Sequence, residues 1–187
     1  MFNKTLLLSL LFLCITMPVS AQDNWQDKVH FMKLLDTLDR KHDGYCLDIV
    51  GSGNNVRLDM PLTTHNCKIE MGLPADELVV HREDGTIYFP AYEGCVTVMG
   101  VNDHALPYNA LMLKQCNQDQ PFLKATKFQN FRINNDKQLQ LEGTSLCITA
   151  GDVSEVTYSD AHRWRSLYMQ KCTVAEPSLS QWHFVKP

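Results

Sequence analysis

The sequence has no surplus of positive charge, which argues against nucleic acid as a partner. Its 187 residues carry 17 Lys and Arg against 21 Asp and Glu, a formal net charge of −4. Proteins that hold nucleic acid through its phosphates need a basic surface. With 44% hydrophobic and 20% charged residues, the chain also lacks the composition of a disordered tail or a coiled coil. We therefore expect a folded domain that binds no nucleic acid.

The sequence also lacks an apolar run long enough to span a bilayer. Residues 6–15 are almost wholly apolar, follow Lys4 and precede a small-residue cleavage site that ends at Ala21. A run of about ten residues is roughly half of what a transmembrane helix needs. We expect residues 1–21 to be a signal peptide, residues 22–187 to form the mature chain, and the protein to be secreted or periplasmic, with no transmembrane segment.

No catalytic or metal-binding motif is present in the sequence. The seven histidines form no His-Glu-x-x-His pair, and there is neither a Gly-x-Ser-x-Gly turn nor a phosphate-binding loop. No Cys-x-x-Cys pair offers a template for zinc. Asp76 and Glu77 are a pair of carboxylates, as glycosidases use, but neighbours on a strand or turn point apart. We therefore expect a protein that is not an enzyme, with no catalytic residue, no metal and no cofactor.

The expected mature chain has six cysteines, an even number that suits disulfides in an oxidising compartment. They are Cys46, Cys67, Cys95, Cys116, Cys147 and Cys172. Taken two by two along the chain they are 21, 21 and 25 residues apart, and the pairs recur with a period of about fifty residues. Six cysteines allow fifteen pairings. The repeat selects the pairing in sequence order, because any other scheme would break the equivalence of the three units.

Apolar residues recur at the same distances from the cysteines in all three units. The positions five before each second cysteine are Leu62, Leu111 and Leu167, and those eight before each first cysteine are Leu38, Ile87 and Leu139. Short alternating segments between turn residues indicate half-buried strands, and we expect Leu38 to lie on such a strand. No unit is large enough to bury a core alone, so we expect a barrel closed about a pseudo-three-fold axis. The repeats span about 28–79, 80–131 and 132–187.

The sequence resembles the ricin-type β-trefoil lectins (ricin B-like lectin domains) over about residues 28–187. The resemblance rests on Cys46-Leu47-Asp48, on Asp84-Gly85-Thr86-Ile87 and on the place of the family's Gln-x-Trp motif. That motif is incomplete in each unit, as Glu77-Leu78-Val79, Gln129-Asn130-Phe131 and Ser180-Gln181-Trp182. The resemblance implies an all-β fold, a β-trefoil of three pseudo-repeats, each with one internal disulfide.

The resemblance also implies a sugar site in the first unit. The family places an acid two residues after the first cysteine, where it accepts bonds from sugar hydroxyls, and only this unit keeps it, as Asp48. His65 holds the place of the aromatic residue that stacks on the sugar, and Asp76 and Glu77 hold places where the family often carries Asn and Gln. The alternative for Asp48 is a turn residue that accepts backbone N–H bonds beside Gly51, and for His65 a surface histidine without a ligand.

The third unit has four extra residues between its cysteines, in a region that contains Tyr158, His162, Arg163, Trp164 and Arg165. We assign Trp164 to the carbohydrate-binding residues, because its ring suits stacking on a sugar while the flanking arginines suit an acidic group. The alternative is that Trp164 folds back and caps the barrel.

The leading expectation is a secreted, lectin-like protein that binds a glycan weakly through one degenerate site in the first repeat. The alternative is a non-catalytic accessory or cell-binding subunit of a toxin or other protein complex, in which the trefoil binds a partner protein chain. This second role resembles that of the ricin-like subunits of cytolethal distending toxin. The incomplete motifs favour it.

Overall fold

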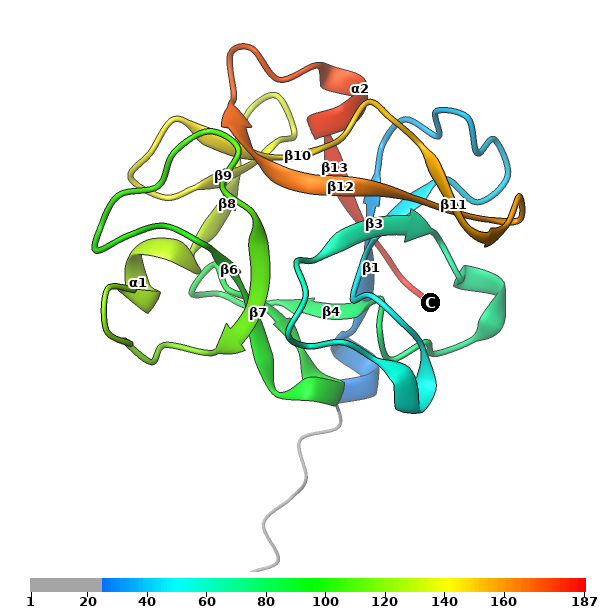
Figure 1. The fold of residues 1–187 in the computed structure, drawn as a ribbon, viewed down its shortest axis with the longest axis horizontal. Helices are drawn as coiled ribbons and strands as arrows, with labels where there is room; N and C mark the ends of the chain where they lie inside the picture. Colours follow the sequence, from blue (N-terminus) through cyan, green and yellow to red (C-terminus); the bar gives the residue numbers. More distant parts are fainter. Residues whose placement is uncertain (1–24) are drawn as a thin grey trace, which may run out of the picture.

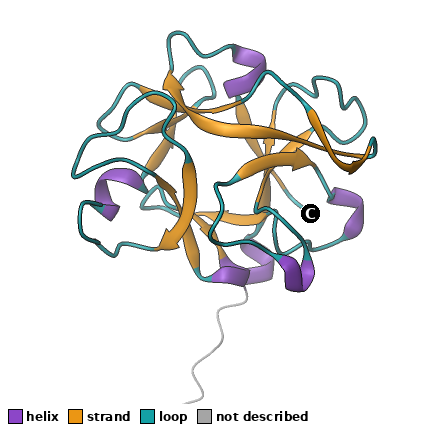
Figure 2. Ribbon diagram, viewed as in Figure 1, coloured by secondary structure: helices purple, strands orange, loops and turns teal. Residues whose placement is uncertain are grey.

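The computed structural model describes residues 25–187, and short strands make up most of its regular structure (Figure 1; Figure 2). The expected signal peptide, residues 1–21, lies outside this range. The strands are β1 (His30–Leu34), β2 (Tyr45–Asp48), β3 (Thr63–Asn66), β4 (Leu78–His81), β5 (Ile87–Phe89), β6 (Gly94–Val98), β7 (Leu111–Gln115), β8 (Phe131–Ile133), β9 (Leu139–Leu141), β10 (Leu146–Ala150), β11 (Glu155–Ser159), β12 (His162–Lys171) and β13 (Trp182–Val185). The short helical segments are η1 (Trp25–Lys28), η2 (Gly53–Asn55), η3 (Ile69–Met71), η4 (Pro90–Tyr92), α1 (Ala125–Phe128) and α2 (Pro177–Ser180).

Each third of the chain contributes four strands to the same arrangement. The second and third strands of each unit form a hairpin: β2 with β3, β6 with β7, and β10 with β12. The first and fourth strands form a ring in which β1 pairs with β4, β4 with β5, β8 with β9, and β13 with β1. Isolated bridges from Thr86 to Asn130 and from Gln138 to Gln181 complete this ring. The predicted all-β trefoil is confirmed.

Equivalent apolar side chains of the three units meet in one core. Leu62, Leu111 and Leu167 are each at most 3% exposed and belong to the same cluster. The residues at the Trp place of the Gln-x-Trp motif are Val79, Phe131 and Trp182, and all three are buried in that cluster. The fold therefore tolerates different volumes at this place, as core positions do when their neighbours adjust.

Each unit carries its own disulfide, which confirms the pairing predicted from the repeat. Cys46 bonds to Cys67, Cys95 to Cys116, and Cys147 to Cys172. Each bridge links the second strand of a unit to the residue directly after its third strand. Closing a loop of this length stabilises a fold by about 3 kcal/mol in the chain-entropy model.

The expected strand position of Leu38 is wrong. Leu38 lies in a turn with φ of 52°, and the strand residue that joins Ile87 and Leu139 in the core is Met32. The strand partner of Cys46 is Lys33, thirteen positions earlier in the chain. The strand partners of Cys95 and Cys147 precede them by seven positions. The connection between β1 and β2 is thus six residues longer than its counterparts, so counting back from the cysteine reaches the loop and not the strand.

The third unit also departs from the symmetry, through the extra strand β11. This strand forms a hairpin with an unusually long β12, and β12 pairs on its other side with β3 of the first unit (Figure 1). Asp39, on the long β1–β2 connection, accepts a bond of 2.6 Å from Arg165 on β12. Burial alone would raise the pKa of Asp39, but the bonds from Arg165 and other neighbours lower it to about 2. The two irregular segments are therefore joined by a charged contact.

Candidate functional site

A groove of about 1690 Å³ is lined mainly by the first and third units, with a few residues of the second. Its floor is the sheet formed by β2, β3 and β12, in which Asp48 stands opposite Thr63, and His65 opposite Trp164. Residues that face each other in an antiparallel pair project on the same side of the sheet. Asp48, His65 and Trp164 are therefore brought to one face, and all of them line the groove.

Aromatic side chains form much of the groove wall. Tyr108 and Tyr168 lie with ring centroids 5.5 Å apart, and Tyr158 stacks on His162 at 4.4 Å. Tyr92, from η4 of the second unit, lines the groove as well. Tyr108 and Tyr158 are 71% and 79% exposed, so much of each ring is accessible to a ligand. Aromatic faces suit the C–H surfaces of sugars and the apolar parts of other ligands.

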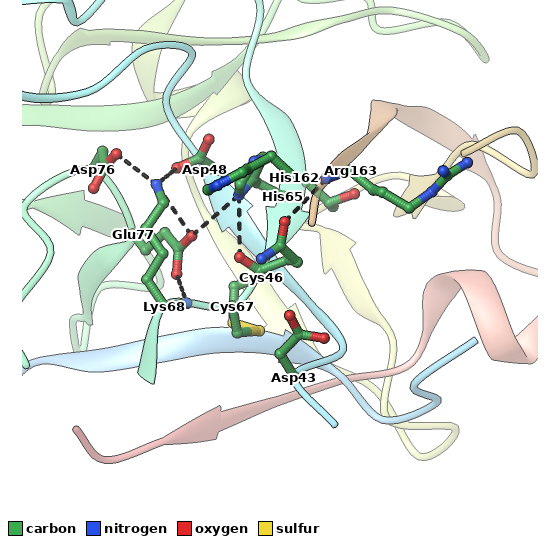
Figure 3. A network of polar contacts seen from close by, with 12 residues as sticks. Asp43, Cys46, Asp48, His65, Cys67, Lys68, Asp76, Glu77, His162 and Arg163 are labelled. Carbon is green, nitrogen blue, oxygen red and sulfur yellow. Dashed lines mark hydrogen bonds and ion pairs between the residues drawn. A yellow bond between two sulfur atoms is a disulfide. The ribbon is translucent and has the colours of Figure 1, made fainter. Parts of the chain in front are cut away.

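Three carboxylates and one ammonium form a buried cluster (Figure 3), of which Asp48, Lys68 and Asp76 line the groove. Nζ of Lys68 lies 2.6 Å from Asp76 Oδ2 and 3.1 Å from Asp48 Oδ1. It lies 3.4 Å from Glu77 Oε1, and the backbone N–H of Lys68 donates to Glu77 Oε2 at 2.8 Å. The three acids are at most 6% exposed. The acids that the sequence assigned to a sugar site are thus together, but they already bind a cation of the chain itself.

The second unit shows why the first one needs Lys68. There the amide of Gln129 donates directly to the hydroxyl of Thr97 at 2.8 Å. At the equivalent places the first unit carries two carboxylates, Glu77 and Asp48, which accept hydrogen bonds when ionised but cannot donate them. Lys68 supplies the missing donors and the opposite charge.

Burial shifts the titration of this cluster. Loss of solvent raises the pKa of Asp48 well above its usual range and raises the pKa of Glu77 to about 7, although Lys68 opposes both shifts. Burial alone would lower the pKa of Lys68, but the surrounding carboxylates outweigh it and raise that pKa. Lys68 therefore stays charged, and Glu77 gains and loses its proton near neutral pH.

His65 is neutral at pH 7. It is 8% exposed, and its Nδ1 lies 3.1 Å from the carbonyl oxygen of Asn66, to which it donates. Burial, reinforced by the charge of Lys68, lowers the pKa of His65 to about 4. This ring therefore presents an uncharged aromatic face to the groove.

We expect Glu77→Gln to stabilise the protein more at pH 8 than at pH 5, relative to the unchanged chain. The folded-state pKa of Glu77 is about 7, above the ordinary value of 4.5, so folding favours the protonated side chain. This stabilisation is complete below pH 4.5 and is lost as the pH rises through 7. Gln carries no ionisable proton, so the variant does not lose stability in this way. Urea unfolding at both pH values measures the difference, and Glu142→Gln at an exposed site is the matched control. Equal effects of Glu77→Gln at both pH values would contradict the assignment.

Trp164 is half-buried on β12 and lines the groove, so it does not cap the barrel as the alternative had it. The arginines beside it point to the other face. Arg165 is 6% exposed and donates to the carbonyls of Gly151 and Asp152. Arg163 extends away from the acid cluster (Figure 3) and donates to Ser154. The expected use of this arginine pair to bind an acidic group of the ligand does not fit this arrangement.

The role of Lys68 and the grouping of the tyrosines were not predicted from the sequence. A signal for Lys68 was present, because three neighbouring acids in a buried site require a cation and Lys68 directly follows Cys67. The tyrosines come from loops and strands of different units, and no spacing in the sequence links them.

Within residues 25–187, no three His, Cys, Asp or Glu side chains are placed to hold a metal ion. The same range contains no helix with the length and apolar character needed to cross a membrane.

No protein-family model and no curated protein matches the sequence. Among solved structures, the chain is similar to the mdaA-1 domain, with 14% identity and a TM-score of 0.56 over 85% of this chain and 90% of that one. It is also similar to the β-trefoil lectin of the Vibrio vulnificus hemolysin/cytolysin, solved with N-acetyl-D-lactosamine bound. The identity is 13% and the TM-score 0.52, over 85% of this chain and 94% of that one. A third match is the Haemophilus ducreyi cytolethal distending toxin, with 13% identity and a TM-score of 0.51 over 90% of this chain and 89% of that one. At these identities the likeness establishes the fold.

Proposed function

We propose that this protein binds carbohydrate in the groove over β2, β3 and β12. The observation that carries the proposal is the shared face of Asp48, His65 and Trp164, with exposed tyrosine rings beside it. Stacking faces next to hydrogen-bonding groups are the combination that a sugar requires. The neighbouring Vibrio lectin, which binds N-acetyl-D-lactosamine, has the same fold and supports this class of ligand.

The cluster around Lys68 takes part as a unit in the proposed site. Lys68 is 15% exposed as a side chain and Asp76 8%, so a hydroxyl in the groove meets an ammonium and a carboxylate together. Asp48 and Glu77 lie deeper and hold Lys68 in place. These two groups already bond to each other at 2.6 Å, so a hydroxyl has to compete with that ion pair. We therefore expect modest affinity.

Replacement of Trp164 by Ala is expected to weaken glycan binding about tenfold or more while the fold stays intact. Truncated Trp residues at the centre of binding sites commonly cost this much. A glycan array identifies a ligand, and calorimetry with that ligand measures the change. Phe122→Ala is the control, because it removes an aromatic ring that is 75% exposed and does not line the groove. Unchanged binding by Trp164→Ala would place the site elsewhere.

A second candidate is an accessory or cell-binding subunit of a toxin or other complex. One observation favours it: the acids of the first unit are already bound by Lys68, and the Thr97 hydroxyl of the second unit by Gln129. The fold is shared with the cytolethal distending toxin structure. Co-purification of a second chain from the native source tests this role. In both roles we propose that the protein acts by binding and not by catalysis.

Three disulfides support maturation in an oxidising compartment. We propose that the chain is secreted or periplasmic after removal of residues 1–21. Amino-terminal sequencing of the native protein tests this proposal, since a start at residue 22 is the expected result.

A further inference from the structure

We infer that the groove selects uncharged glycan chains and excludes glycans that carry sialic acid, uronic acid or sulfate. The inference rests on the proposed function and adds the class of glycan. It follows from the charges that face the groove, from the direction of the neighbouring arginines and from the size of the groove.

Acidic side chains outnumber basic ones along the groove. Asp43, Asp48, Glu70 and Asp76 line it, and within residues 25–187 the sole Lys or Arg side chain that does so is Lys68. Asp43 is neutralised by Arg40, at 2.9 Å. Glu70 on η3 is exposed and forms no ion pair among the described residues. The Glu70 carboxylate is therefore left to repel an incoming anion, and this repulsion is strongest at low salt.

Lys68 is not available to an anionic ligand. Its ammonium already faces Asp76, Asp48 and Glu77, within 3.4 Å of each. Asp76 lies nearest, at 2.6 Å, so a carboxylate or sulfate that approached Lys68 would have to displace a carboxylate of the chain itself. Breaking the contacts would leave buried carboxylates without a partner, which is costly.

The arginines that flank Trp164 are not placed to bind an anion in the groove. Arg165 is held on the far face of β12 by Asp39 and by backbone carbonyls. Arg163 donates to Ser154 on that side and lies 3.4 Å from Asp39. His65 remains uncharged, because its pKa is lowered to about 4. The groove floor thus offers aromatic and hydrogen-bonding groups without a free cation.

The size of the groove indicates a chain of several sugars. Pockets for compact small molecules span about 300–1,000 Å³. This groove, at about 1690 Å³, is larger than that range. Its volume therefore suits a ligand of more than one sugar.

The experiment compares matched pairs of oligosaccharides, each neutral and in its sialylated or sulfated form. We expect the mature protein to bind the neutral member at least about tenfold more tightly at low salt. Glu70→Lys should reduce this preference by about fivefold, since one nearby charge changes sign at an exposed site. Glu142→Lys, which makes the same charge change outside the groove, should leave the preference unchanged.

The outcomes separate this inference from the proposed function. Binding of neutral chains with rejection of the acidic partners supports both. Equal or tighter binding of the acidic members overturns the selectivity and leaves carbohydrate binding in place. Absence of binding to every member of either kind overturns carbohydrate binding itself. An equal response to Glu70→Lys and Glu142→Lys would show that net charge, and not the groove, sets the preference.

Discussion

Replacement of Lys68 by Met is expected to lower the free energy of unfolding by about 3–5 kcal/mol at pH 7, because it leaves buried carboxylates without their cation. Met keeps most of the volume of the lysine stem, so the loss reports the charge and not a cavity. The acids Asp48, Asp76 and Glu77 then have to take up protons or admit water. Urea unfolding with the disulfides intact measures the change.

Two further variants make this result specific to the cluster. Lys124→Met removes an exposed lysine that lies 3.2 Å from Asp119, and such surface pairs contribute about 0–1 kcal/mol. Lys68→Asn combined with Asp48→Thr, Glu77→Gln and Asp76→Asn removes all four charges of the cluster, and the first three changes copy the second unit. This variant should restore most of the stability. A loss below about 1 kcal/mol in Lys68→Met would mean that the cluster is open to water and not buried.

Replacement of Trp182 by Ala is expected to cost about 3–5 kcal/mol, the usual range for a large aromatic residue removed from a core. Trp182 is 1% exposed, and its Nε1 donates to the carbonyl of Ile148 at 3.0 Å. The variant leaves a cavity where the three units meet and an unpaired carbonyl on β10. Trp182→Phe, which places the residue type of Phe131 at this position, should lower the free energy of unfolding clearly less.

The two buried or half-buried tryptophans should separate stability from binding. Trp182→Ala is expected to lower the melting temperature and keep glycan binding at temperatures where it is folded. Trp164→Ala is expected to keep the melting temperature and weaken glycan binding, because the Trp164 ring lines the groove and is only half-buried. If Trp182→Ala abolished binding while fully folded, the core and the groove would be coupled in a way that their separate positions do not explain.

The sequence predicted the fold well because disulfide spacing and core positions repeat. The pairing of the six cysteines and the shared burial of Leu62, Leu111 and Leu167 follow from one period of about fifty residues. Leu38 was misplaced because the β1–β2 connection of the first unit is longer than its counterparts. A repeat fixes positions only where no residues have been inserted.

The site was predicted in part. The positions of Asp48, Asp76 and Glu77 follow from the repeat, but their ion pairs with Lys68 depend on contacts between residues up to 20 positions apart. The tyrosine rings and the pairing of His65 with Trp164 join different units. Such contacts arise from the folded arrangement and leave no local pattern in the chain. Whether these residues bind sugar remains a prediction for the variants above.

The position of the groove makes ligand binding a test of complete folding. Its floor joins β3, from the first third of the chain, to β12, from the last third, and the barrel closes only when β13 pairs with β1. A polypeptide that ends before residue 162 would lack β12, one of the three strands of the floor, however well its first two units fold. Recognition of a ligand should therefore appear late during synthesis, as the final strands join the first ones.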